Sequence, residues 1–195
     1  MKKRIRQSYI QKRNNLNLNF ILDVSERICE QILSQFPLED AQTIALYYPF
    51  NQEVNVLPII EALLQKNKRV VLPKVLSKTT MGFFEISHLE DVEVSAFGVK
   101  EPISTVEVPV HTIDWMFIPG VAFNPDCYRL GYGAGYYDRF LQHASIKTVG
   151  VAYDFQITDE FIPEAHDVPL MYVITENRLL QHRNEDDSSN PNMGS

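Results

Sequence analysis

The sequence predicts an α/β domain built around a mostly parallel β-sheet. Short, uninterrupted apolar runs at residues 43–48, 115–118 and 148–152 are typical of strands buried on both faces. Segments with apolar residues at helical spacing stand between several of these runs, and this alternation indicates a layered α/β domain. The length of 195 residues suits one domain with an ordinary hydrophobic core.

The N-terminal third of the chain is expected to contain three helices and two strands. Apolar residues at helical spacing, such as Ile5 and Tyr9 in the first segment, predict the helices. Pro58 can occupy the first turn of the third helix, and the apolar runs that end at Pro49 and Pro73 predict the strands. In chain order we expect a helix over 2–13, a helix over 20–35, a strand over 43–48, a helix over 54–66 and a strand over 69–72.

The rest of the chain is expected to add four strands and one helix. An irregular stretch runs through residue 102, and the candidate for a central strand stops at Pro119 and Gly120. The polar residues 183–195 are expected to form a disordered tail, which leaves residues 1–182 as the domain. In chain order we expect a strand over 81–86, a strand over 115–118, a loop over 120–135, a helix over about 136–143, and strands over 148–152 and 172–175.

Charge is unevenly distributed along the chain. The net charge is −7, yet no acidic residue precedes Asp23, and the chain beyond the basic N-terminus carries 12 basic and 25 acidic residues. An acidic body argues against non-specific binding of nucleic acid, which needs a broad basic surface. A short basic segment on such a body suits one compact anionic ligand. The basic residues of this segment are Lys2, Lys3, Arg4, Arg6, Lys12 and Arg13.

Composition also argues against several other classes of protein. The two cysteines, Cys29 and Cys127, are too few for a disulfide scaffold and favour a reducing compartment. No apolar run approaches membrane-spanning length, and the N-terminus lacks the apolar core of a signal peptide. The five histidines show no zinc-binding spacing. We therefore expect a cytoplasmic protein that does not associate with membranes.

The strongest motif is the glycine-rich segment RLGYGAGYYDRF at residues 129–140. Backbone amides of such a turn, placed before a helix, form a site for phosphate, although a tight turn with packed tyrosines explains the glycines equally well. The spacing is neither the dinucleotide fingerprint nor a P-loop. Arg129 and Asp138 favour the phosphate site, since a fixed cation and a carboxylate that can reach Mg²⁺ suit phosphoryl transfer. The three glycines are Gly131, Gly133 and Gly135.

Three other features have both a functional and a structural interpretation. Lys2 and Arg6 are spaced i, i+4 and could grip a phosphate chain, although a solvated helix end is the commoner arrangement. Glu53 follows a strand end and could face a substrate, or it could simply favour the start of a helix. Asp167 could form a turn or lie near a metal, and His166 is expected to be structural.

These segments together resemble the 5-formyltetrahydrofolate cyclo-ligases, also called methenyltetrahydrofolate synthetases. The glycine-rich segment, preceded by FIPGVAF at residues 117–123, is similar to the signature of that family. The resemblance covers roughly residues 2–176, which argues against a match by chance. The further matching segments are Lys2…Arg6, Tyr48-Pro49…Glu53-Val54, Val71–Lys74, Phe97–Pro102, Gly150–Ala152 with Gln156, and His166–Pro169.

The resemblance implies a Rossmann-like three-layer α/β/α fold and a reaction that depends on ATP and Mg²⁺. In that reaction 5-formyltetrahydrofolate is cyclised to 5,10-methenyltetrahydrofolate, with release of ADP and phosphate. The formyl oxygen would be phosphorylated, and N10 would then attack the formyl carbon. The resemblance also implies a monomer whose partners are small molecules, a reduced folate and ATP.

The family pattern also implies a role for each matching residue. Lys2 and Arg6 would contact the ATP phosphates, and Glu53 would hydrogen-bond the pterin or position N10. Lys3, Arg4, Lys12 and Arg13 are expected to be solvated charges that attract ATP. The implied catalytic residues are Lys2, Arg6, Glu53, Arg129 and Tyr136. The implied folate-binding residues are Tyr48, Glu53 and Tyr136, and the implied Mg²⁺ ligands are Asp138 and Asp167. The implied ATP-binding residues are Lys2, Lys3, Arg6, Arg129, Leu130, Gly131, Tyr132, Gly133, Ala134, Gly135, Tyr136 and Tyr137.

Three positions depart from the family pattern. Asn124 stands where Asp is usual and Cys127 where Gly is usual. The family pattern therefore does not decide the backbone geometry just before the glycine-rich segment. Met171 stands where an Asp is frequent, and activity would be weakened if that Asp bound the metal. No catalytic role is expected for Cys127. Two other functions stay open: a folate- or nucleotide-binding protein without turnover, and a related ATP-dependent enzyme that acts on another formyl or pterin substrate.

Overall fold

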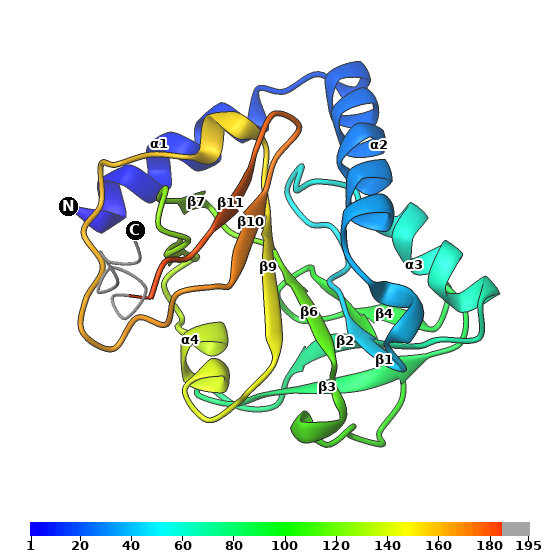
Figure 1. Ribbon diagram of the computed structural model, residues 1–195. Helices are drawn as coiled ribbons and strands as arrows, with labels where there is room; N and C mark the ends of the chain where they lie inside the picture. The colour runs from blue at the N-terminus through cyan, green and yellow to red at the C-terminus, as the bar shows by residue number, and fades with distance from the viewer. Residues whose placement is uncertain (185–195) are drawn as a thin grey trace, which may run out of the picture.

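The computed structural model describes residues 1–184, and a seven-stranded sheet runs through these residues (Figure 1). Its five inner strands are parallel, whereas the two edge strands pair antiparallel to their neighbours. The mostly parallel sheet predicted from the sequence is therefore confirmed. From one edge to the other, the strands are β11 (Leu179–Gln181), β10 (Tyr172–Ile174), β9 (Lys147–Val151), β6 (Trp115–Ile118), β1 (Thr43–Ala45), β2 (Arg69–Val75) and β3 (Met81–Ile86).

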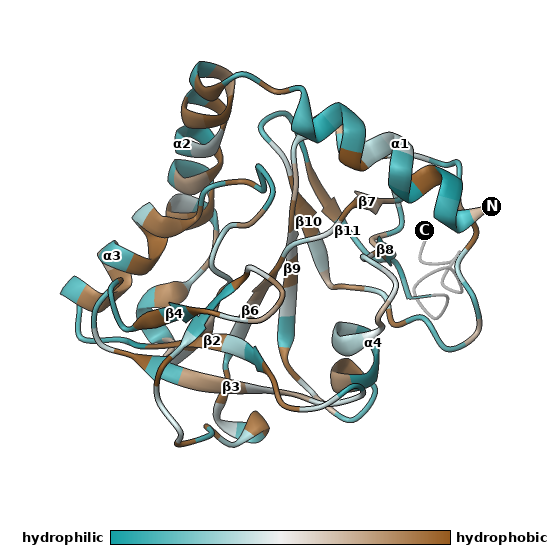
Figure 2. Ribbon diagram, turned by 180° about the vertical axis from the view of Figure 1, so that it is seen from behind, coloured by the Kyte–Doolittle hydropathy of each residue, from teal (hydrophilic) through white to brown (hydrophobic). Residues whose placement is uncertain are grey.

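Both faces of the sheet are buried, and alternate residues of a strand join two different hydrophobic clusters. In β6, Trp115 and Phe117 belong to one cluster, whereas Met116 belongs to the other. The first cluster includes α2 (Leu18–Gln35) and α3 (Leu57–Gln65), and the second includes residues of α4 (Tyr136–Leu141). Figures 1 and 2 show α2 and α3 on one side of the sheet and α4 on the other. A strand covered on both faces must be apolar throughout, which explains the uninterrupted runs in the sequence.

Several short strands were not predicted from the sequence. The stretch expected to be irregular contains a hairpin of β4 (Val92–Val94) and β5 (Lys100–Pro102). The loop expected over residues 120–135 contains β7 (Ala122–Phe123) and β8 (Arg129–Leu130), which pair antiparallel. Both expectations were wrong, because strands of two or three residues are too short to show a periodic pattern. The predicted end of a strand at Pro73 was also wrong, because β2 continues to Val75. Beyond Val71 it pairs with β3 and no longer with β1.

The remaining helix, α1 (Lys2–Asn14), lies across β7 and β8 rather than on the main sheet. Ile5 and Tyr9 on its apolar side share a hydrophobic cluster with Val121, Ala122 and Leu130. Figure 2 shows most of the other residues of α1 in the colour of hydrophilic residues. This packing brings the basic N-terminal segment next to the glycine-rich segment, which begins in β8.

The direction in which strands are added reverses between β1 and β6. The chain adds β2 on one side of β1, and then crosses to add β6, β9 and β10 on the other side. The loops that leave the carboxyl ends of β1 and β6 therefore diverge, and ligands of open α/β sheets bind in the crevice between such loops. Within residues 1–184, no helix is both long enough and apolar enough to cross a membrane. The polar tail expected over 183–195 lies almost wholly outside the described residues.

Candidate active site

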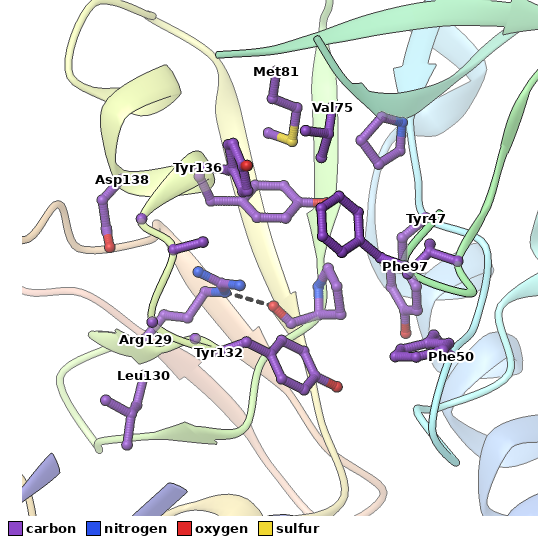
Figure 3. A pocket seen from close by; sticks show the side chains of 18 of the residues that line it. Tyr47, Phe50, Val75, Met81, Phe97, Arg129, Leu130, Tyr132, Tyr136 and Asp138 are labelled. Carbon is purple, nitrogen blue, oxygen red and sulfur yellow. Dashed lines mark hydrogen bonds between the residues drawn. The ribbon is translucent and has the colours of Figure 1, made fainter. Parts of the chain in front are cut away.

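A cavity of about 680 Å³ opens at this reversal point, and segments far apart in the sequence line it. Its size is that of a small-molecule site. Figure 3 shows Arg129 and Asp138 on one side of the cavity, and the aromatic side chains of Tyr47, Phe50 and Phe97 on the opposite side. The cavity thus has a charged end and an aromatic end. The lining segments are the start of α1, the loop after β1, the end of β2, the β4–β5 hairpin, the glycine-rich segment and residues 164–167.

The glycine-rich segment needs its glycines for two different reasons. Gly133 has φ +109°, a backbone conformation that other residues rarely adopt. At Gly131 a Cβ would lie 2.8 Å from Nη1 of Arg129, so a larger residue there would displace this guanidinium group. The loop backbone can therefore lie directly against a guanidinium group at the charged end of the cavity.

Arg129 is held rigidly at the charged end. Its Nε donates a hydrogen bond to the carbonyl oxygen of Pro119, 2.5 Å away, and its guanidinium lies 4.7 Å from the ring centre of Tyr137 (Figure 3). Burial lowers the pKa of this guanidinium, and the nearby Tyr137 and Asp138 oppose that shift. Arginine stays charged under such conditions, so the cavity contains a fixed positive charge.

Helix α1 brings two further cations to the same end. Nε of Arg6 donates to the carbonyl oxygen of Gly131 at 2.8 Å, and Nζ of Lys2 lies 3.3 Å from both Oδ2 of Asp167 and Oε1 of Glu164. Both side chains line the cavity together with Arg129. Lys3 is the exception among the residues implied to bind ATP, because the structure places it on the exposed side of the helix and not at the cavity.

The expectation that Arg13 is solvated was wrong. Its side chain is buried, with 1% of the residue exposed, and its nitrogen atoms donate to three acceptors. Nε donates to the carbonyl oxygen of Asn51 at 2.7 Å, Nη1 to the carbonyl oxygen of Gly120 at 3.2 Å, and Nη2 to the hydroxyl of Tyr132. These partners lie 38 to 119 residues away in the sequence, so no local pattern indicates them.

Glu53 is a buried carboxylate at the cavity wall, with 7% of the residue exposed. Burial raises its pKa to about 7, although the positive charges of Arg13 and Arg129 and the N–H of Phe50 act in the opposite direction. The Phe50 N–H donates to Oε1 at 2.8 Å and fixes the side chain. A carboxyl group that titrates near neutrality inside a cavity is a candidate for proton transfer.

The other side chains implied to bind ligands differ in how strongly neighbouring groups hold them. Tyr48 lines the cavity, with Nζ of Lys100 4.9 Å from its ring centre. The hydroxyl of Tyr136 donates to the carbonyl oxygen of Ser77 at 3.1 Å, which fastens the glycine-rich segment to the β2–β3 turn. Leu130 also borders the cavity, but its side chain is buried in the cluster that holds α1.

The two aspartates implied to bind Mg²⁺ both line the charged end. The pKa of Asp138 is raised by burial and further by the charge of Asp167, while Arg129 opposes the shift. Carboxylate oxygens are the ligands that Mg²⁺ prefers, and a divalent cation would relieve this repulsion, so the donor set fits the metal. His166, expected to be structural, is exposed and lies 3.2 Å from Glu164; these two residues and Asp167 offer ligand atoms within 4.8 Å of one another.

The three departures from the family pattern have simple structural consequences. Oδ1 of Asn124 accepts hydrogen bonds from the N–H groups of Asp126 and Tyr128, at 3.0 and 2.9 Å, which an aspartate would accept as well. Cys127 has φ +67°. This left-handed conformation favours glycine, which explains why glycine is usual at this position in the family. Its thiol is buried, and burial raises its pKa to about 12. Met171 is 40% exposed and is not among the residues that line the cavity.

Comparison with known proteins points to one family. The model of the 5-formyltetrahydrofolate cyclo-ligase family matches residues 1–176. The 5-formyltetrahydrofolate cyclo-ligase of Mycoplasma pneumoniae is 34% identical over 179 residues, which cover 90% of this chain and 98% of that protein. The enzyme of the same name from Haemophilus influenzae is 33% identical over 156 residues, covering 76% and 83% of the two chains. The NMR structure of the Aquifex aeolicus 5,10-methenyltetrahydrofolate synthetase superposes with a TM-score of 0.83 at 33% identity, over 94% of this chain and 93% of that chain.

Proposed function

Because the chain belongs to the 5-formyltetrahydrofolate cyclo-ligase family, we propose that it catalyses the ATP-dependent cyclisation of 5-formyltetrahydrofolate to 5,10-methenyltetrahydrofolate. One observation in the structure carries the proposal. A single cavity has a charged end with Lys2, Arg6 and Arg129 and an aromatic end where the buried carboxylate of Glu53 accepts a hydrogen bond from the N–H of Phe50. A polyanion and a flat heterocycle can therefore bind side by side.

ATP binds at the charged end in this proposal. Lys2, Arg6 and Arg129 neutralise the phosphate chain, and the backbone of the glycine-rich segment approaches it closely. Charge moves between phosphate oxygens during phosphoryl transfer, so cations fixed before the reaction lower the barrier more than mobile ones. Arg6 and Arg129 are fixed by hydrogen bonds to the carbonyl oxygens of Gly131 and Pro119.

The folate binds at the aromatic end, where Tyr48 and Tyr136 contact the ring system and Glu53 lies near N10. The formyl oxygen attacks the γ-phosphorus, the bond to the bridging oxygen breaks, and ADP leaves. The carbon attached to N5 is now electrophilic, and N10 attacks it, loses its proton and closes the ring. The C–O bond then breaks and phosphate leaves with the former formyl oxygen. Because one cavity holds both substrates, proximity supplies most of the acceleration of the reaction.

Glu53 accepts the N10 proton in this scheme. Its pKa of about 7 matches the pH at which a base is both ionised and able to take a proton. Asp138 and Asp167 hold Mg²⁺, which supplies additional positive charge to the phosphate oxygens when bound. Lys2, which pairs with Asp167, contacts the same phosphate groups in this proposal.

The test is incubation with 5-formyltetrahydrofolate and Mg-ATP, while methenyl absorbance and ADP are followed together. Equal amounts of both products are expected. ADP without methenyltetrahydrofolate would instead indicate a related ATP-dependent enzyme acting on another formyl or pterin substrate. Binding of folate or nucleotide without either product would indicate a binding protein. Glu53→Gln is the matched variant for this assay. It keeps the shape of the site, removes the proposed base and should lower turnover.

A further inference from the structure

We propose that Arg13 is a positioning residue, which joins the ATP-binding and folate-binding parts of the cavity and holds the turn that carries Glu53 in its reactive geometry. The inference rests on the function proposed above. Arg13 is not among the residues that line the cavity, so it acts on the reaction through other groups. Its burial and its three hydrogen bonds set it apart from the other cations of the basic N-terminal segment.

The three acceptors of Arg13 belong to three different segments, the two loops that diverge at the reversal point of the sheet and the glycine-rich segment. Asn51 lies in the loop after β1, Gly120 follows β6, and Tyr132 lies in the glycine-rich segment. A guanidinium group presents its N–H groups in a planar, rigid fork, and so fixes the relative positions of several acceptors at once. Arg13 thus connects the loops after β1 and β6 with the glycine-rich segment.

The turn that Arg13 holds is strained. Asn51 and Gln52 have φ values of +48° and +58°, so two successive residues other than glycine adopt the left-handed conformation. Such a turn persists only if its surroundings hold it. Arg13 binds the carbonyl oxygen of Asn51, and the hydroxyl of Tyr153 donates to that of Gln52 at 2.9 Å. Glu53 is the next residue, and its position follows from this turn.

The same helix serves both parts of the cavity. Lys2, Arg6 and Arg13 are four and seven residues apart, a spacing that places them along one side of α1. Arg6 contacts the glycine-rich segment, while Arg13 contacts the turn before Glu53. The helix therefore sets the distance between the bound phosphates and the base that acts on N10.

Arg13 also supplies the charge environment of Glu53. Burial is the largest influence on the pKa of Glu53, and Arg13 exerts the largest opposing one. Arg129 is the other positive group near it, and it also serves the charged end of the cavity. The titratable groups that face Glu53 are Arg13 of α1, Arg129 of β8, Tyr132 of the glycine-rich segment, Tyr47 after β1, Tyr137 of α4 and Tyr153 after β9.

The test follows the carboxyl carbon of Glu53 by ¹³C NMR titration, with the signal assigned by its loss in Glu53→Gln. Arg13→Met removes the charge and the hydrogen bonds but keeps the length of the side chain. We expect its titration midpoint to lie at least about one pH unit above that of the wild type, since an opposite charge has been lost. Lys12→Met removes a positive charge from the neighbouring residue, which is exposed and lies over the Tyr9 ring, and should leave the midpoint unchanged.

Kinetics provide a second readout. A midpoint one unit higher leaves about one fifth as much ionised Glu53 at pH 7, so kcat of Arg13→Met should fall about five-fold there. Arg13→Lys should restore the midpoint, because it keeps the charge, but not the full kcat, because an ammonium group cannot reach three acceptors. A merely structural role would lower the melting temperature without moving the midpoint.

The outcomes separate this inference from the proposed function. An unchanged midpoint in folded Arg13→Met overturns the role of Arg13, whatever the turnover. Absence of turnover in the wild type overturns the proposed function, while the titration still decides on Arg13. If Arg13→Met does not fold, Asn51→Gly is added, since glycine adopts the left-handed conformation without strain. The double variant should then fold and still show the raised midpoint.

Discussion

Nε of Arg6 donates a hydrogen bond to the carbonyl oxygen of Gly131, 2.8 Å away, although the two residues are separated by 125 positions in the chain. The contact joins the basic start of an acidic protein to its glycine-rich segment. The guanidinium carbon of Arg6 also lies 3.6 Å from where a Cβ of Gly133 would stand. Under the proposed function, the charge asymmetry of the sequence corresponds to one anion site, built from the first helix and the middle of the chain.

Replacing Arg6 by Ala should lower kcat/KM for ATP by about 100-fold or more, because a fixed donor at the phosphate chain is lost. Lys2→Ala should show a loss of the same kind. Arg4→Ala is the matched control, since Arg4 is exposed on the same helix and does not line the cavity. Steady-state kinetics with varied ATP measure the effect. Equal kcat/KM values for Arg6→Ala and Arg4→Ala would contradict the assignment.

Glu53→Gln should stabilise the fold at pH 8 while it lowers turnover. The pKa of Glu53 is raised from 4.5 to about 7 in the folded protein, so between these values the folded state binds a proton that the unfolded chain does not. Stability contributed by this group therefore falls as the pH rises through this range, and above pH 7 the buried charge costs up to about 3 kcal/mol. Glutamine removes that cost and can still accept the Phe50 N–H.

Thermal unfolding at two pH values checks this prediction. Glu53→Gln should melt several degrees above the wild type at pH 8 and close to it at pH 4.5. Glu61→Gln, an exposed change on α3, should show no such pH-dependent difference. A melting temperature of Glu53→Gln below that of the wild type at both pH values would show that Glu53 is not a destabilising charge.

The sequence was sufficient to predict the central strands, because strands buried on both faces leave continuous apolar runs. It also predicted the helices that cover the sheet, whose apolar residues recur at helical spacing. The buried state of Arg13 could not be predicted, since its acceptors are carbonyl oxygens and a hydroxyl brought close only by the fold. The hairpin of β4 and β5 was missed for a different reason: its strands of three residues are too short to show a reliable period.

Neither cysteine should react with a thiol reagent in the native protein. Cys29 and Cys127 are both buried, and burial raises the pKa of each to about 12, so almost no thiolate is present at pH 8. Titration with a chromogenic disulfide should detect two thiols per chain after denaturation and none on the same timescale before it. Cys127→Ala should keep its turnover. Rapid modification of Cys127 accompanied by loss of activity would reveal a role for this thiol.

Asp138→Asn should increase the Mg²⁺ concentration needed for half-maximal turnover by about ten-fold or more, because a carboxylate ligand becomes a neutral amide. Chelation of divalent metal should abolish wild-type turnover, and added Mg²⁺ should restore it. Asp159→Asn is the control, since Asp159 is exposed and does not line the cavity. The same Mg²⁺ requirement in Asp138→Asn and the wild type would remove Asp138 from the metal site.

The most direct test of the proposed reaction follows the oxygen atom of the formyl group. If the cavity transfers the γ-phosphoryl group to that oxygen and N10 then expels phosphate, ¹⁸O placed in the formyl group must leave with the phosphate. Turnover of labelled 5-formyltetrahydrofolate with Mg-ATP should yield one ¹⁸O-labelled phosphate and one ADP for each methenyltetrahydrofolate, as detected by mass spectrometry. Unlabelled phosphate formed alongside methenyltetrahydrofolate would contradict the proposed transfer.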